Sequence, residues 1–190
     1  MIPSYLISIK KQFRYYKSLG DKTFEQLNPE KLHWQPNEAS NSIAVIVKHI
    51  VGNMLSRWTN FTTEDGEKEW RERDQEFIDT YQSKEALLES WEKGWKCLFD
   101  ALNHLSDEDL NNIVYIRNQG HTIAEAINRQ LAHYPYHIGQ IVYLGRMILD
   151  NEWQSLSIPK GESSSFNEKK FNQQKERGHY TDDFLNSEDA

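Results

Sequence analysis

The run of residues 122–149 repeats its apolar side chains at the spacing of an α-helix. It opens with Thr122-Ile123-Ala124-Glu125, the capping-box pattern in which the Thr hydroxyl and the Glu carboxylate satisfy backbone donors at a helix start. A helix of this length has to bury its apolar stripe against other elements. The run therefore limits the chain to folds built around one long packed helix.

The rest of the chain favours more helices rather than a sheet. Three further segments carry the same apolar period and are expected to be helical at about 3–19, 42–60 and 83–105. Gly20 is expected to end the first of these helices, and Asn41 or Ser42 to cap the second. Strand signals are limited to a short stretch around Val114 and Ile116. The sequence thus predicts an all-α four-helix bundle.

A polar C-terminal part follows the predicted bundle. The composition changes near residue 155, which divides the chain into a bundle at 1–155 and an extension at 156–190. Within the extension, Ser163-Ser164-Ser165 is expected to cap a short helix at about 166–176. The acidic end, residues 178–190, is expected to be disordered. The connection at 62–79 is rich in charge and is expected to be exposed, with some helix around Trp70.

Charge and composition narrow the class of protein. The 190 residues include 22 Lys and Arg against 29 Asp and Glu, a net charge of −7, which argues against nucleic-acid binding and anionic membranes. No apolar run reaches the roughly 18 residues of a membrane span, and the N-terminus lacks signal-peptide features. The single cysteine, Cys97, excludes an internal disulfide and is expected to be a buried apolar residue. We expect a cytoplasmic protein.

Two histidines, His133 and His137, lie four residues apart within the long helical run. Residues at this spacing share one face of a helix, so both imidazoles can reach a single point. A cation is the usual reason to bring neutral imidazoles together, and a site of this kind needs a third ligand. His49 lies in the middle of the second predicted helix, beside its apolar stripe. Three imidazoles from two helices would leave one position open, as in catalytic zinc sites.

Other interpretations of these histidines stay open at this stage. A bundle without metal would keep them as packed or hydrogen-bonded core residues. The helix lacks the internal Glu of zinc peptidases, so we do not predict a peptidase. Pro135 lies between His133 and His137, where a mid-helix proline costs about 3 kcal/mol. It either kinks the helix and tilts His137 towards His133, or a curved bundle helix tolerates it.

Further polar residues lie one turn from the three histidines on the same helix faces. The candidates for holding the ligands in place or contacting a substrate are Asn53, Arg57, Arg129 and Gln140. For the two arginines, a solvated helix face is at least as good an interpretation. No residue stands out as a catalytic base.

Together these features resemble the DinB/YfiT-like proteins, in particular a branch of small uncharacterised Bacillus-type members. The resemblance covers nearly the whole chain. It is carried by His49 within the stretch 48–58, by Glu64-Asp65-Gly66-Glu67, by the stretch 126–141 with its His-x3-His pattern, and by Ile158-Pro159-Lys160-Gly161-Glu162-Ser163.

The resemblance implies a DinB-like four-helix bundle, usually a homodimer, with a divalent metal held by His49, His133 and His137. Zinc or nickel is the expected metal, and iron would also accept three imidazoles. The implied function is that of a metal-dependent enzyme, either a transferase that joins a low-molecular-weight thiol to an electrophile or a hydrolase of small molecules. The alternative is a non-enzymatic stress-related or interaction protein in which the metal braces the bundle.

Overall fold

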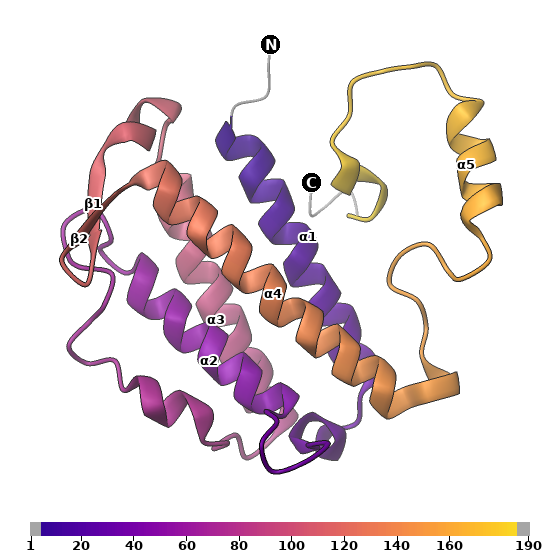
Figure 1. Cartoon of the computed structure of the whole chain (residues 1–190), viewed down its shortest axis with the longest axis horizontal. Helices are drawn as coiled ribbons and strands as arrows, with labels where there is room; N and C mark the ends of the chain where they lie inside the picture. Colours follow the sequence, from indigo (N-terminus) through magenta and orange to yellow (C-terminus); the bar gives the residue numbers. More distant parts are fainter. Residues whose placement is uncertain (1–4, 186–190) are drawn as a thin grey trace.

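Four long helices pack into a bundle in the computed structural model, which describes residues 5–185 (Figure 1). They are α1 (Tyr5–Gln26), α2 (Ile43–Trp58), α3 (Lys84–Asn103) and α4 (Ile123–Leu149). A short fifth helix, α5 (Ser163–Phe171), lies in the C-terminal extension. The predicted all-α bundle with a helical extension is therefore confirmed. The division of the chain near residue 155 stays a prediction.

Two of the predicted helix starts are present with their side-chain caps. The Ser42 hydroxyl accepts a hydrogen bond from the backbone N–H of Val45 at 3.2 Å, at the start of α2. The Thr122 hydroxyl accepts from the backbone N–H of Glu125 at 3.1 Å, and the Glu125 carboxylate accepts from the backbone N–H of Thr122 at 2.8 Å. Both caps satisfy donors that a helix leaves open in its first turn.

The predicted end of the first helix at Gly20 is wrong, because α1 continues to Gln26. Gly20 serves close packing instead. A Cβ atom built at this position would lie 2.6 Å from a ring carbon of Trp91 on α3. The glycine therefore lets a fully buried indole approach the α1 backbone, which a stop signal read from sequence cannot distinguish from a helix end.

A small hairpin precedes α4 and confirms the predicted extended stretch. Its strands β1 (Ile113–Ile116) and β2 (Gln119–Thr122) are antiparallel. The two turn residues, Arg117 and Asn118, have φ of 57° and 59°, as a tight two-residue hairpin turn requires. The Asp65 carboxylate accepts hydrogen bonds from both of their backbone N–H groups at 2.8 Å. The acidic motif after α2 thus fastens the hairpin to the bundle.

The connection between α2 and α3 differs from the predicted exposed loop. Lys68 and Glu76 are buried, while Trp70 is exposed. The helical turn in this connection, η2 (Arg73–Phe77), follows Trp70 rather than surrounding it. η2 packs against α2. Apolar periodicity could not show this, because the buried side chains of the connection are charged and are stabilised by ion pairs.

The C-terminal extension differs from the sequence prediction in two ways. Ser163 to Ser165 lie inside the first turn of α5 rather than before it, because the helix already begins after Glu162. The chain then returns to α1, where η5 (Tyr180–Asp183) buries Thr181 completely and Asp182 forms an ion pair with Lys11 at 2.5 Å. The expected disorder is therefore absent up to residue 185, and residues 186–190 lie outside the described part of the chain.

The core lies between the four long helices and is rich in aromatic rings. Trp91 and Trp95 from α3, Phe13 from α1 and Tyr134 from α4 are fully buried. This packing sets α2 beside α4, with α1 on the other side of α4 (Figure 1). Within residues 5–185, no helix combines the length and apolarity needed to cross a membrane. The neighbouring α2 and α4 carry the histidines singled out in the sequence.

Candidate metal centre

His49 on α2 and His133 and His137 on α4 converge in the structure. Their candidate ligand atoms all lie within 4.8 Å of one another. The Nε2 atom of His133 lies 3.4 Å from Nε2 of His49 and 3.1 Å from Nε2 of His137. Ligand nitrogens about 2.0–2.1 Å from a tetrahedral zinc ion are about 3.3 Å apart. The predicted trio therefore has the spacing of three ligands around one ion.

The other ring nitrogen of each histidine faces an oxygen acceptor. The Nδ1 contacts are Glu76 Oε2 at 2.9 Å for His49, Gln130 Oε1 at 3.3 Å for His133, and Gln140 Oε1 at 2.9 Å for His137. An oxygen of this kind accepts the Nδ1 proton, which leaves the lone pair of a neutral imidazole on Nε2. Three lone pairs then point at one place, and they repel each other unless a cation is present. The residues fit a divalent ion.

The half-buried setting of the two α4 histidines favours the neutral form that binds metal. Burial, together with the neighbouring His137 and His49, lowers the pKa of His133 from 6.5 to about 3. Burial also lowers the pKa of His137, although its hydrogen bond with Gln140 partly opposes this. At neutral pH these two imidazoles carry no charge, so no proton competes with a cation for their Nε2 atoms.

The geometry of α4 explains how it presents two ligands and their acceptors. Gln130 lies three residues before His133 and Gln140 three residues after His137, so each amide reaches its imidazole along the helix face. α4 is drawn as one continuous helix (Figure 1), and Pro135 lies inside its range. One unbroken helix agrees with both interpretations of this proline, a kink and tolerance by a curved helix.

Glu76 is a buried carboxylate that reaches the centre from η2. Arg71 donates to it twice, from Nε to Oε1 at 2.7 Å and from Nη2 to Oε2 at 2.9 Å. Burial alone would raise the pKa of Glu76, but the hydrogen bonds from His49 and Arg71 hold that pKa below its ordinary value. The ring of Phe77 stacks on His49 with 4.9 Å between centroids. The connection between α2 and α3 thus supports His49 from two sides.

Arg57 and Arg129, both predicted as candidate contacts, have different surroundings. Arg57 is buried rather than on a solvated face, and its Nη1 donates to the carbonyl of Gly66 and to the Glu67 carboxylate, the latter at 3.0 Å. Glu67 also accepts from Nη1 of Arg71 at 3.2 Å. Arg57 therefore belongs to the ion-pair network behind Glu76. Arg129 is exposed, as a solvated helix face predicts.

Asn53 and Gln140, the two predicted amides, also have different surroundings. Gln140 contacts a ligand directly, since its side-chain oxygen faces His137. Asn53 instead accepts a hydrogen bond from the hydroxyl of Tyr134 at 3.1 Å. That hydroxyl also accepts from the indole N–H of Trp58 at 3.0 Å. The structure thus assigns Asn53 to a buried network that joins α2 to α4 next to the histidines.

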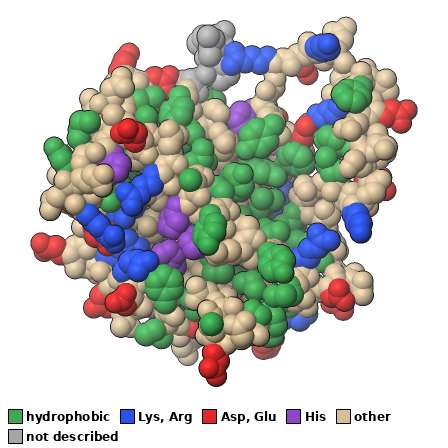
Figure 2. All heavy atoms as spheres, viewed as in Figure 1, with side chains coloured by type: hydrophobic (Ala, Val, Ile, Leu, Met, Phe, Trp, Pro, Cys, Tyr) green, Lys and Arg blue, Asp and Glu red, His purple; other side chains and the backbone are tan. Residues whose placement is uncertain are grey.

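The centre reaches the molecular surface. Figure 2 shows histidine side chains exposed between α2 and α4, beside a group of basic side chains. His133 and His137 are half-buried, whereas His49 is buried, with only 6 % of its surface exposed. A small molecule could therefore approach an ion held by these side chains from the α4 side.

Sequence reasoning missed three residues that support the ligands: Glu76, Arg71 and Gln130. Gln130 had a usable signal, since it stands at the same spacing from His133 as Gln140 does from His137. Glu76 and Arg71 had no direct sequence signal, because they lie in an irregular connection without periodicity. The one indirect sign was Gly52, a glycine in the middle of an apolar helix, which indicates close approach of another group.

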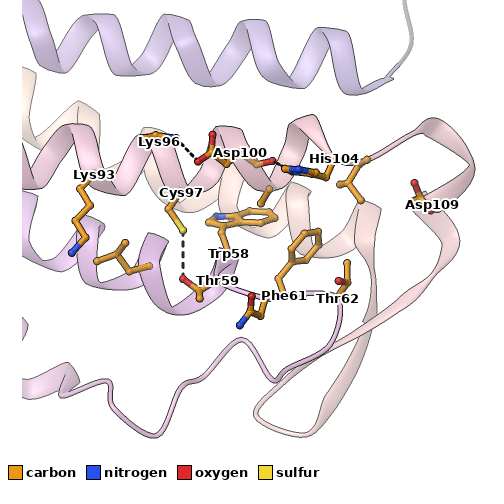
Figure 3. Close-up of a pocket in the computed structure, with 14 residues that line it drawn as sticks. Trp58, Thr59, Phe61, Thr62, Lys93, Lys96, Cys97, Asp100, His104 and Asp109 are labelled. Carbon is orange, nitrogen blue, oxygen red and sulfur yellow. Dashed lines mark hydrogen bonds and ion pairs between the residues drawn. The ribbon is translucent and has the colours of Figure 1, made fainter.

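A hollow separate from the metal centre lies between α2 and α3, and none of the three histidines lines it (Figure 3). It has a volume of about 610 Å³ and is lined by Trp58 and by charged side chains of α3. Cys97, expected to be a buried apolar residue, is half-buried in its wall and packs against the core, with Sγ 3.6 Å from the Thr59 hydroxyl. In Figure 3, Lys96 pairs with Asp100 at 2.6 Å, and Lys93 and Asp109 lie at opposite ends of the hollow, so the charged side chains do not converge on one point.

Comparison with known proteins places the chain in a family. Neither the curated proteins nor the solved structures contain a match to it. A family model described as "Protein of unknown function (DUF1572)" matches residues 1–162. The match includes the three histidines and Glu76, and it ends before α5. Because it covers most of the sequence, the chain belongs to the DUF1572 family.

Proposed function

We propose that this protein is a divalent-metal-dependent enzyme of the DinB/YfiT-like type, with His49, His133 and His137 as the metal ligands. One observation carries the proposal: three Nε2 atoms converge while each Nδ1 faces an oxygen acceptor. Zinc and nickel both suit three imidazoles, and iron is a third candidate. The resemblance of the whole chain to DinB/YfiT-like proteins supports the same assignment.

The number of ligands favours catalysis over bracing. Among the described residues, the group of His, Cys, Asp and Glu side chains that could share an ion has three members. Structural zinc sites close all four positions with protein ligands, whereas catalytic sites keep one position for water or substrate. The partial exposure of the α4 histidines supports access to that position. A non-enzymatic role with a bracing metal therefore has less support than an enzyme.

The reaction we propose is transfer of a low-molecular-weight thiol to an electrophile, with small-molecule hydrolysis as the variant that uses water. A divalent ion supplies a Lewis acid that lowers the pKa of a bound thiol or water. In the transfer, the thiol releases its proton to solvent, and a sulfur–carbon bond forms while the bond from that carbon to the leaving group breaks. A halide departs with the bonding electron pair, whereas the oxygen of an opened epoxide stays on the product and takes up a proton. The imidazoles bind the ion as neutral ligands, and Gln130, Gln140 and Glu76 hold the rings in position.

Metal content tests the first half of this proposal. We expect purified protein to carry about one divalent ion per chain by elemental analysis, and a His133→Ala variant to lose it, since two imidazoles bind far more weakly than three. His104→Ala is the matched control, because His104 is exposed at the end of α3. An unchanged metal content in His133→Ala would reject the site.

The ratio of thiol to electrophile consumed tests the second half of the proposal, which concerns the reaction. The metal-loaded protein is incubated with a thiol and a haloarene or epoxide, and both reactants are followed. Equal loss of thiol and electrophile indicates a transferase. Loss of the electrophile alone indicates a hydrolase and rejects the transferase. Turnover that is equal in wild type and His133→Ala would contradict a role for the metal centre in either reaction.

A further inference from the structure

Gly52 occupies an unusual place in α2, three residues after His49. A glycine inside a helix costs about 1 kcal/mol relative to alanine. The backbone conformation does not require a glycine at this position, since among the described glycines a positive φ occurs at Gly161 and not at Gly52. A Cβ built on Gly52 would lie 2.3 Å from Oε1 and 2.7 Å from Cδ of Glu76. Only glycine therefore leaves room for the Glu76 carboxylate against α2.

The carboxylate that fills this space is fixed from several directions. Arg71 binds both of its oxygens, and Arg71 is in turn paired with Glu67, which also binds Arg57. The side chains of Arg71 and Glu76 are 3 % and 7 % exposed. Buried charges of this kind keep one geometry, since leaving either charge unpaired is strongly destabilising. The chain of ion pairs ends at Nδ1 of His49, 2.9 Å from the carboxylate.

His49 differs in this respect from the other two ligands. His133 and His137 are held by neutral amides of their own helix, whereas His49 is held by a carboxylate from η2. A carboxylate is the stronger acceptor, and as the outer partner of a ligating histidine it fixes the tautomer and makes the ring a better donor to metal. The charged acceptor thus supports His49, the one ligand that comes from α2, whereas α4 supplies both of the other ligands and the amides that hold them.

We propose that Glu76 is the positioning residue of the metal centre, admitted by Gly52 and held by Arg71, and that its charge strengthens metal binding through His49. This inference rests on the proposed function, because it assumes that the three histidines bind a divalent ion. Glu76 acts through His49 and not on a substrate.

Two variants test the role of Glu76 independently. Glu76→Gln keeps the shape and an acceptor oxygen but removes the charge, and Gly52→Ala keeps the carboxylate but displaces it. Zinc affinity is measured by competition with a chromophoric chelator, and both variants are expected to bind about 10–100-fold more weakly than wild type. Long-range ¹H–¹⁵N NMR of the metal-free protein reports the His49 tautomer, which should stay Nδ1–H in Glu76→Gln and become mixed in Gly52→Ala.

Two controls match these changes. Glu72→Gln removes an exposed carboxylate four residues away in the same connection. Gly139→Ala adds a methyl group to a helix glycine whose Cβ would meet nothing within 4 Å. Both should bind zinc as wild type does. If Gly52→Ala fails to fold, as circular dichroism would show, Glu76→Gln alone decides.

The outcomes separate this inference from the proposed function. Wild-type zinc affinity in Glu76→Gln and in folded Gly52→Ala would overturn the role of Glu76 and leave the metal centre intact. Absence of zinc binding by the wild-type protein would overturn the proposed function itself, and this inference with it. Weaker binding in Glu72→Gln equal to that in Glu76→Gln would show a general effect of charge and also overturn the inference.

Discussion

At the scale of single residues, the hydroxyl of Tyr134 has the most demanding position near the histidines. It is fully buried, accepts from the indole of Trp58 and donates to Asn53. Burial raises the pKa of this phenol far above its ordinary value, although the bond from Trp58 opposes the shift. The phenol therefore stays protonated and serves as a donor between α2 and α4.

We predict that Tyr134→Phe lowers the free energy of unfolding by about 1–3 kcal/mol, because it leaves the buried Trp58 N–H without its acceptor. Urea unfolding measures the change. Tyr115→Phe is the control, since Tyr115 lies on β1 and is 53 % exposed. Equal stabilities of the two variants would contradict a structural role for this hydroxyl.

The residue scale also shows where prediction from sequence succeeded and where it could not. His49, His133, His137 and Gln140 follow from helical spacing, because a regular helix fixes which side chains share a face. Glu76 does not, since its position depends on how an irregular connection folds back over α2. Its partner Arg71 lies in the same irregular connection, so no periodic pattern could predict its position either.

At the scale of elements, α4 carries a proline between two ligands without a break. We predict that Pro135→Ala raises the midpoint of thermal unfolding, because the substitution restores a backbone donor and removes a clash worth about 3 kcal/mol in a helix interior. Zinc affinity is expected to stay unchanged. A loss of affinity in this variant would show that a proline-dependent bend is needed to bring His137 to His133.

The connection between α2 and α3 is predicted to be sensitive to acid through Glu67. Burial would raise the pKa of Glu67, but Arg71 and Arg57 outweigh it and lower that pKa below 4.5. A carboxylate with a lowered pKa stabilises the fold above its ordinary pKa, and this stabilisation is lost as pH falls through the lowered value.

Glu67→Gln should therefore reduce the free energy of unfolding of the metal-free protein by about 1–3 kcal/mol at pH 7. The difference from wild type should shrink as the pH approaches 3. Urea unfolding with a chelator present, at both pH values, measures it, with Glu72→Gln as the control for charge alone. A difference that grows towards low pH would contradict the assigned direction.

The elements themselves were predictable to different degrees. The caps at Ser42 and Thr122 and the apolar stripes located α2, α3 and α4 to within a few residues, because local chemistry decides such ends. Gly20 misled, since its role depends on a tryptophan some 70 residues later, a contact absent from any local pattern.

At the scale of the whole molecule, apolar side chains gather over α1 and the C-terminal half of α4 (Figure 2). On α4, Tyr143 and Met147 are 67 % and 39 % exposed. An exposed apolar surface of this kind often marks an interface between proteins. It is consistent with the homodimer that the DinB/YfiT-like resemblance implies.

We predict that light scattering coupled to size-exclusion chromatography gives twice the chain mass of 22.5 kDa. Tyr143→Lys should shift the protein towards the monomer, because it places a charge in the apolar contact. Phe171→Lys, at an 83 % exposed position on α5, should leave the mass unchanged. A wild-type protein that elutes as a monomer would contradict the dimer.

The most direct test of the metal centre is anomalous diffraction at the zinc edge from crystals of the zinc-loaded protein. We expect one strong peak between α2 and α4, about 2.0–2.1 Å from the Nε2 atoms of His49, His133 and His137. Each Nδ1 should keep its oxygen acceptor. A peak elsewhere, or zinc bound through Nδ1 or through fewer than three of these imidazoles, would contradict the three-histidine metal centre.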